Sequence, residues 1–143
     1  MALHSGRDAA TGEQIGPRTG DPRTFATFDQ FFAAFKAQLK TLLELLIAAN
    51  DVADTGRAQF EPTPYVSALV DGCLESGRDI TAGGARYNFI TVEGVALATA
   101  ADSLAAVKKL IYDERAMAMD ELLQALDANF EGYEPLRQTL LNK

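Results

Sequence analysis

The stretch that decides the fold is residues 28–50, FDQFFAAFKAQLKTLLELLIAAN, in which apolar side chains recur at intervals of three and four residues. This spacing places them on one face of an α-helix, so it predicts one long helix from about Phe28 to Asn50. Thr27 and Gln30 stand where a capping box would begin that helix. The apolar face is heavy in phenylalanine, and these rings need other protein to cover them, because an exposed patch of that size drives association.

The segments around this helix predict a mainly α fold with a short β element. Residues 1–24 are expected to form a loop that lies on other protein, since glycine and proline recur too closely for a helix or strand, while 25–143 is expected to be mostly helical. Residues 87–92 follow a glycine pair and are rich in β-prone side chains, which predicts one short strand. Further helices are expected near Pro64 to Gly77, over Ala98–Asp113, from Asp120 with Leu122, Leu123 and Leu126 inward, and over Glu134–Leu141.

Composition limits the classes of function. A chain of 143 residues with 48% hydrophobic and 23% charged residues is typical of one globular domain at most. Its net charge of -7 repels phosphate backbones, so no nucleic-acid partner is expected. The single cysteine can form neither an intramolecular disulfide nor a thiolate metal cage, which favours the cytoplasm. No signal core opens the chain and the most apolar run, 42–49, contains Glu44, so no membrane span is expected.

Two residues invite a catalytic interpretation that the sequence does not support. Cys73 with Glu75 resembles a reactive pair, but Cys73 shares a helical face with Val66 and Val70, and cysteine is among the most buried residue types. Burial is therefore the favoured interpretation. His4 is the only histidine and is expected to be solvated, with no metal site, because no second histidine accompanies it.

The segment after Gly83 and Gly84 is the better candidate for a binding site. The glycine pair with Arg86 could cradle a phosphate or could allow close packing of backbone, and the spacing matches neither well-known phosphate loop. Tyr87 follows directly, where it could either point into a cavity or be buried as a structural residue.

Four stretches, taken in order, resemble one known family. They are TGEQIGPRTGDP at 11–22, GCLESGRDITAGGARYNF at 72–89, ADSLAAVKKL at 101–110 and DELLQALDANFEGYE at 120–134. Their order and spacing resemble the glycyl radical enzymes, in the branch of the glycerol and diol dehydratases, choline trimethylamine-lyase, hydroxyproline dehydratase and the arylsuccinate synthases.

The resemblance implies a chemistry for which this chain lacks the central parts. Family members store a radical on a glycine in an Arg-Val-x-Gly-Tyr loop and pass it to a cysteine in an earlier Cys-x-Glu loop, which abstracts hydrogen from the substrate. Arg-Val-x-Gly-Tyr does not occur here, and Cys73-Leu-Glu75 falls after the position of the family's catalytic loop. The resemblance therefore implies a fragment that lies between the two loops, in the ten-stranded α/β barrel of the family, with no catalytic residue of its own.

The expected function is a fragment of a lyase or dehydratase that acts on a small alcohol or amine and is inactive alone. The resemblance implies that Tyr87 lines the substrate pocket, supported by Arg86 and Asn88. It also implies no bound cofactor, a separate radical S-adenosylmethionine activase, and a homodimeric intact enzyme in the cytoplasm or a bacterial microcompartment. A fragment of an arylsuccinate-type enzyme that forms C–C bonds, and a non-catalytic helical interaction module or non-functional remnant, remain alternatives. The isolated chain is expected to self-associate.

Overall fold

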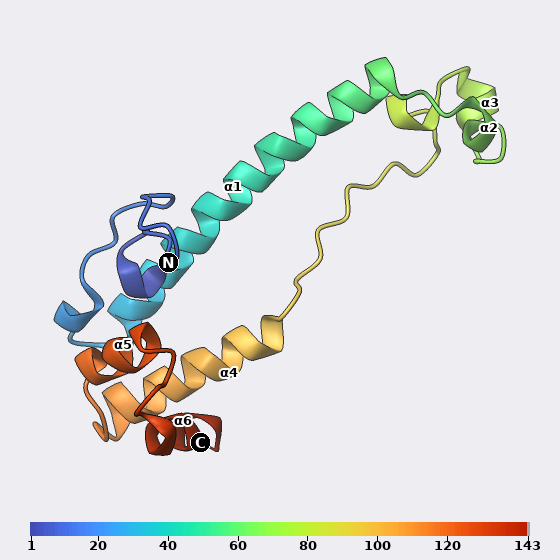
Figure 1. Ribbon diagram of the computed structural model, residues 1–143. Helices are drawn as coiled ribbons and strands as arrows, with labels where there is room; N and C mark the ends of the chain where they lie inside the picture. Colours follow the sequence, from blue (N-terminus) through green and yellow to red (C-terminus); the bar gives the residue numbers. More distant parts are fainter. Residues whose placement is uncertain (143) are drawn as a thin grey trace. The chain divides into compact units, whose positions relative to one another are not determined.

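The structure is a computed structural model in which residues 1–142 are described, and they are mainly helical as predicted (Figure 1). The elements are η1 (Ala2–His4), η2 (Pro22–Thr24), α1 (Phe28–Phe60), α2 (Pro64–Ser67), α3 (Cys73–Ser76), η3 (Ile80–Ala82), α4 (Leu97–Val107), the π-helix η4 (Lys108–Asp113), α5 (Met119–Asp127) and α6 (Glu134–Leu141). Unit 1 comprises residues 1–41 with those from 94 onward, and unit 2 comprises Leu42–Glu93. None of the described helices is both long enough and apolar enough to cross a membrane.

Helix α1 begins where the sequence predicts and ends later. The Thr27 Oγ1 accepts a hydrogen bond from the Gln30 amide at 3.4 Å, as predicted, whereas the Gln30 Oε1 accepts one at 2.7 Å from the amide of Ala26 and not from that of Thr27. The predicted end at Asn50 is wrong, because the helix runs to Phe60. Gly56 costs about 1 kcal/mol in a helix interior, which does not stop a helix of this length. The helix ends just before Pro62, as proline requires.

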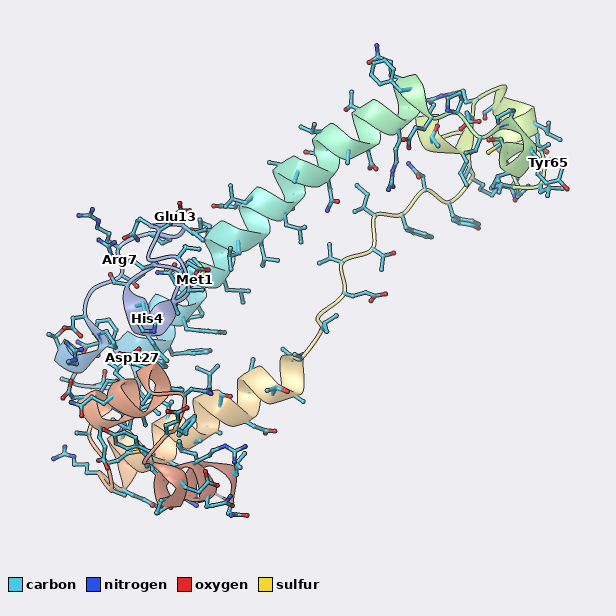
Figure 2. All side chains as sticks on the ribbon, in the orientation of Figure 1. Met1, His4, Arg7, Glu13, Tyr65 and Asp127 are labelled. Carbon is cyan, nitrogen blue, oxygen red and sulfur yellow. The ribbon has the colours of Figure 1, made fainter. Side chains whose placement is uncertain are left out.

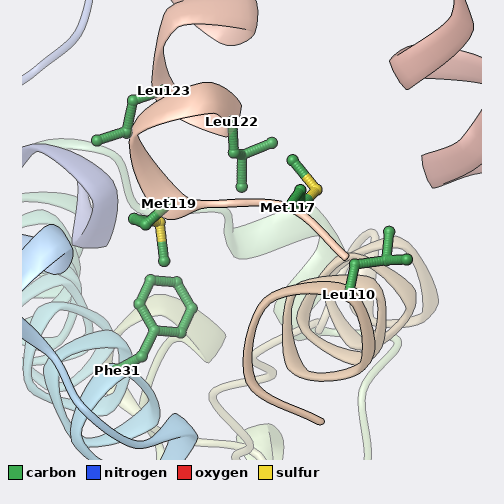
Figure 3. Close-up of a cluster of buried hydrophobic side chains, with 6 residues drawn as sticks. All are labelled: Phe31, Leu110, Met117, Met119, Leu122 and Leu123. Atoms are coloured by element: carbon green, nitrogen blue, oxygen red, sulfur yellow. The ribbon is translucent and has the colours of Figure 1, made fainter. Parts of the chain in front are cut away.

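Unit 1 is built around a small apolar core. Phe31 of α1, Leu110 of η4 and the first half of α5 contribute to it, with side chains at most 9% exposed. The cluster is shown in Figure 3 and consists of Phe31, Leu110, Met117, Met119, Leu122 and Leu123. The inward-facing side of α4 and η4 consists of Leu104, Val107 and Ile111, which pack against this cluster. The predicted burial of Leu126 is wrong: it is 37% exposed, and Ala125 is buried in its place.

The predicted helix over 98–113 forms, but its last turn is wider. Residues Lys108–Asp113 adopt a π-helix, in which hydrogen bonds run from i to i+5. Two exposed ion pairs follow the same spacing: Lys108 Nζ lies 2.5 Å from Asp113 Oδ2, and Lys109 Nζ lies 3.8 Å from Glu114 Oε1. Exposed pairs of this kind contribute about 0–1 kcal/mol each, whereas Leu110 in the same turn is 1% exposed and belongs to the core.

The N-terminal segment lies on α1, as the sequence predicts for a loop that needs other protein. Gln38 of α1 is only 3% exposed, and its Nε2 donates to the Pro17 carbonyl at 2.7 Å and to the Thr19 Oγ1 at 2.9 Å. A side chain at Gly16 would collide with the Gln38 Oε1. One buried glutamine therefore fastens the loop to the helix.

Unit 2 corrects two predictions. The expected helix over 64–77 is broken into α2 and α3, because Gly72 between them has a φ of 96°, which no helix continues through. The expected end of this region at Gly77 is confirmed, since Gly77 ends α3 with a φ of 63°. The expected short strand over 87–92 is also wrong: within residues 1–142 the β pairing consists of one isolated bridge, between Arg7 and Gln14. A strand needs a neighbour for its amides and carbonyls, and the described residues offer none beside this segment.

Candidate functional site

The candidate site lies in unit 2, where the glycine pair sets the path of the chain. Gly83 caps η3 with a φ of 75°, a backbone conformation that residues other than glycine rarely adopt. Gly84 is buried, and a Cβ there would collide with the Arg78 carbonyl. The first glycine is therefore needed for its φ and the second for a close approach of backbone. This favours the close-packing interpretation of the pair over the phosphate cradle.

Arg86 fixes the chain immediately before Tyr87. Its amide donates to the Asp71 carbonyl at 2.9 Å, and its Nη1 lies 3.2 Å from the Asp71 Oδ2. Gly72 has to be glycine here too, because a Cβ would lie 2.5 Å from the Arg86 amide nitrogen. The Arg86 side chain is 66% exposed, so it can contact a further group while it pairs with Asp71.

Tyr87 does not lie in a cavity formed by the described residues. It is 72% exposed, and its ring stacks on that of Phe89, with centroids 6.2 Å apart and planes 9° apart. Two stacked, exposed rings present a flat apolar face and one phenolic hydroxyl. Sequence reasoning did not include Phe89 in the site, although the alternation of aromatic residues at 87 and 89 was visible.

Asn88 lines a cleft that it shares with Phe89 but to which Tyr87 does not contribute. The cleft has a volume of about 410 Å³ and is also lined by three polar residues of α1, Asn50, Asp54 and Arg57. The remaining lining residues are Ile80, Thr81, Phe89, Ile90 and Thr91. Sequence reasoning missed the α1 residues because the helix was expected to end at Asn50. Their spacing of four and three residues places them on one helical face, which is the signal that could have revealed them.

Asp79 is the electrostatic centre of this region. Its Oδ1 accepts from the Thr81 Oγ1 at 2.7 Å and the Thr81 amide at 2.9 Å, and its Oδ2 accepts from the Ser67 Oγ at 2.8 Å and the Thr63 amide at 3.0 Å. These donors, the Thr81 hydroxyl above all, hold the pKa of Asp79 well below its usual range. These hydrogen bonds therefore contribute fully to the stability of the folded chain above the ordinary aspartate pKa of about 3.9. Their contribution is lost as the pH falls below that value and the carboxylate becomes protonated.

Cys73 is buried, as predicted. Its residue is 3% exposed, its thiol forms no disulfide, and its carbonyl accepts from the Arg78 amide at 3.2 Å and from the Ser76 Oγ at 3.2 Å. A thiol enclosed in this way does not reach a substrate from the surface of unit 2.

His4 lies in unit 1, away from these residues in the sequence. It is half-buried and lines a hollow of about 460 Å³ to which Asp127 also contributes; both are labelled in Figure 2. Among residues 1–142, no group of three or more His, Cys, Asp and Glu side chains is placed to hold a metal ion. The chemistry that these residues can supply is hydrogen bonding, charge and ring contact.

Comparison with known proteins identifies the family. The family model for pyruvate formate lyase-like proteins matches residues 1–143. The trans-4-hydroxy-L-proline dehydratase of Clostridioides difficile is 43% identical over 143 residues, which are 100% of this chain and 18% of that protein. The (2S)-3-sulfopropanediol dehydratase of Klebsiella oxytoca is 39% identical over 136 residues, 95% of this chain and 16% of that protein.

A solved structure agrees with these matches. The glycerol-bound form of the B12-independent glycerol dehydratase from Clostridium butyricum superimposes with a TM-score of 0.90 at 35% identity, over 99% of this chain and 18% of that one. The chain therefore belongs to the pyruvate formate lyase-like family of glycyl radical enzymes, as its four sequence stretches predicted. It spans less than a fifth of the length of these relatives.

Proposed function

We propose that this chain is the section of a glycyl radical lyase or dehydratase that presents Tyr87 to a small alcohol or amine substrate. The observation that carries the proposal is the match of the whole chain, at 43% identity, to a dehydratase. In this proposal the chemistry proceeds by hydrogen abstraction, on a radical that a separate radical S-adenosylmethionine activase installs. The Cys-x-Glu and Arg-Val-x-Gly-Tyr loops belong to sequence outside this chain, and the chain alone is inactive.

The buried thiol supports this division of roles. A thiyl radical must reach a substrate C–H bond, whereas Cys73 is only 3% exposed at the start of α3. This chain's own residues would bind and orient the substrate instead. The Tyr87 hydroxyl would hydrogen-bond to a substrate hydroxyl or amine. The exposed Arg86 would add a positive charge, and the side-chain amide of Asn88 would be a further hydrogen-bonding group.

The test begins with the DNA on both sides of this reading frame. An upstream Cys-x-Glu loop and a downstream Arg-Val-x-Gly-Tyr loop, in the same polypeptide or a partner polypeptide, would support the proposal and define the complete enzyme. The absence of both would contradict it and favour a helical interaction module or a remnant without activity.

Replacing Tyr87 with phenylalanine in that complete enzyme is expected to lower kcat/KM about tenfold, because one hydrogen bond to the substrate is lost. Steady-state kinetics after anaerobic activation measures the effect. Tyr65 provides the matched control: it is 80% exposed in the same unit, as Tyr87 is at 72%, but it belongs to α2 and not to the proposed site, so Tyr65→Phe should leave kcat/KM unchanged (Figure 2). Equal kinetics for Tyr87→Phe and the unsubstituted enzyme would remove Tyr87 from the pocket.

The isolated chain is expected to self-associate, and a homodimer is our proposal for the complete enzyme. Apolar side chains of α1 beyond Thr41 stay exposed to between 40% and 74%: Leu42, Leu43, Leu45, Leu46, Ile47 and Val52. Sedimentation velocity across a concentration series should show mass above 15.4 kDa that falls on dilution.

The double variant Leu43→Glu with Ile47→Glu should suppress this association, since it adds two charges to the exposed apolar face. Thr55→Glu with Gln59→Glu adds the same charge at the same spacing on polar positions of α1 and should leave it intact. A chain that sediments as a monomer at every concentration would contradict the prediction.

A further inference from the structure

Backbone hydrogen bonds fix the segment from Asp79 to Tyr87 at two points. The Asp79 carbonyl accepts from the Ala82 amide at 3.0 Å and the Gly84 amide at 2.9 Å, which closes the turn. Two residues later, the Arg86 amide donates to the Asp71 carbonyl at 2.9 Å. Tyr87 follows this second fixed point directly, so its position depends on where the turn is held.

The Asp79 side chain joins the turn to both ends of α2. Its two oxygens accept four hydrogen bonds of 2.7 to 3.0 Å: two from Thr81, inside the turn, one from the Thr63 amide just before α2, and one from Ser67, the last residue of α2. The Ser67 Oγ in turn accepts from the Ile80 amide at 2.9 Å. Two segments separated by 12 to 16 residues are thus joined through one carboxylate.

Both α2 and the Ser67 hydroxyl depend on this carboxylate. α2 has four residues, too few to hold itself or a neighbouring turn, and helices this short depend on outside contacts. Ser67 is 7% exposed, so its hydroxyl needs a partner, and Asp79 provides it. Asparagine cannot replace Asp79 here. Its amide nitrogen would stand where one carboxylate oxygen now accepts two hydrogen bonds, and this nitrogen can only donate.

We propose that Asp79 is a positioning residue of the substrate site: it joins α2 to the Gly83-Gly84 turn and thereby sets the place of Tyr87 and Asn88. The role deepens the proposed function and rests on it for its effect on substrate. Asp79 does not touch the substrate, and it acts through the turn alone.

The first arm of the test uses the chain of 143 residues and needs no activity. Hydrogen–deuterium exchange at pH 7 is measured on peptides that cover 79–86, in the original chain and in Asp79→Asn. We expect exchange about tenfold faster in the variant at these amides, because the turn opens more often. Asp51→Asn, an exposed residue of α1 in the same unit, removes the same charge and should change nothing there. Unchanged exchange in Asp79→Asn would overturn the role.

A milder variant keeps the test informative if Asp79→Asn unfolds unit 2. Thr81→Val removes the shortest hydrogen bond to Asp79 while retaining side-chain shape. It should speed exchange over 79–86 by a smaller factor, about threefold, and leave α1 unaffected. No change with Thr81→Val would count against the role in the same way.

The second arm uses the complete enzyme and separates positioning from general stability. Asp79→Asn should raise KM, and its effect on kcat/KM should not add to that of Tyr87→Phe, because a displaced Tyr87 has no hydrogen bond left to lose. Additive effects would overturn the positioning role. If Tyr87→Phe by itself has no effect, the proposed function fails, and the exchange arm alone then decides whether Asp79 holds the turn.

Discussion

Replacing Gly84 with alanine is expected to destabilise the segment that carries Tyr87 by roughly 2–3 kcal/mol, the cost typical of forcing an added methyl group into a packed site. The added Cβ would collide with the Arg78 carbonyl and crowd that of Asp79, and both obstacles are backbone atoms that cannot rotate away. The Gly84 and Arg86 amides would lose their hydrogen bonds to Asp79 and Asp71. Hydrogen exchange at these two amides should rise about fiftyfold.

Gly56→Ala is the matched control and should have the opposite sign. Gly56 also lies in unit 2, but nothing lies within 4 Å of where its Cβ would stand, and it occupies the interior of α1. Alanine there should stabilise the helix by about 0.5–1 kcal/mol, because it loses less backbone entropy than glycine. Similar effects from the two substitutions would show that the turn at Gly84 is not sterically closed.

Leu110→Ala is expected to lower the free energy of unfolding of unit 1 by about 3 kcal/mol. Leu110 is 1% exposed and belongs to the cluster of Figure 3, so truncation removes apolar contacts and leaves a cavity. Urea denaturation followed by far-UV circular dichroism measures the change, since the helices of unit 1 depend on this cluster. A reduced midpoint with an unchanged slope is the expected form of the result.

Leu97 provides the comparison for Leu110. It begins α4 and is 72% exposed, so Leu97→Ala removes the same atoms from solvent-facing surface and should change stability by no more than about 0.5 kcal/mol. If both substitutions cost the same, the core of unit 1 is not organised around Leu110.

The sequence predicts local features well where neighbouring residues decide the outcome. The cap at Thr27 and Gln30, the αL terminator at Gly77 and the bounds Glu134–Leu141 of α6 are all present, because each depends on residues a few positions apart. The end of α1 was missed because apolar residues become sparse after Asn50, whereas the helix continues through Gly56, whose cost of about 1 kcal/mol does not stop it.

The candidate site shows the limit of the same reasoning. Tyr87, Arg86 and Asn88 are adjacent in sequence, yet the structure separates them: Arg86 pairs with Asp71, Tyr87 stacks on Phe89, and Asn88 faces the cleft beside α1. The alternation at 87 and 89 could have indicated the ring pair, but no spacing rule indicates that Arg86 pairs with Asp71, because the turn brings these two residues together.

The sequence by itself determined the family, the helical character of the chain and the burial of Cys73, since motif order, apolar periodicity and side-chain polarity are properties of the residues themselves. Only the tertiary structure decided that 87–92 forms no strand, that Gly84 is sterically required, and that Asp79 joins Thr63, Ser67 and Thr81. Each of these outcomes depends on how the backbone turns, because the Arg78 carbonyl, the Thr63 amide, the Ser67 hydroxyl and any strand partner are placed only when the chain has folded.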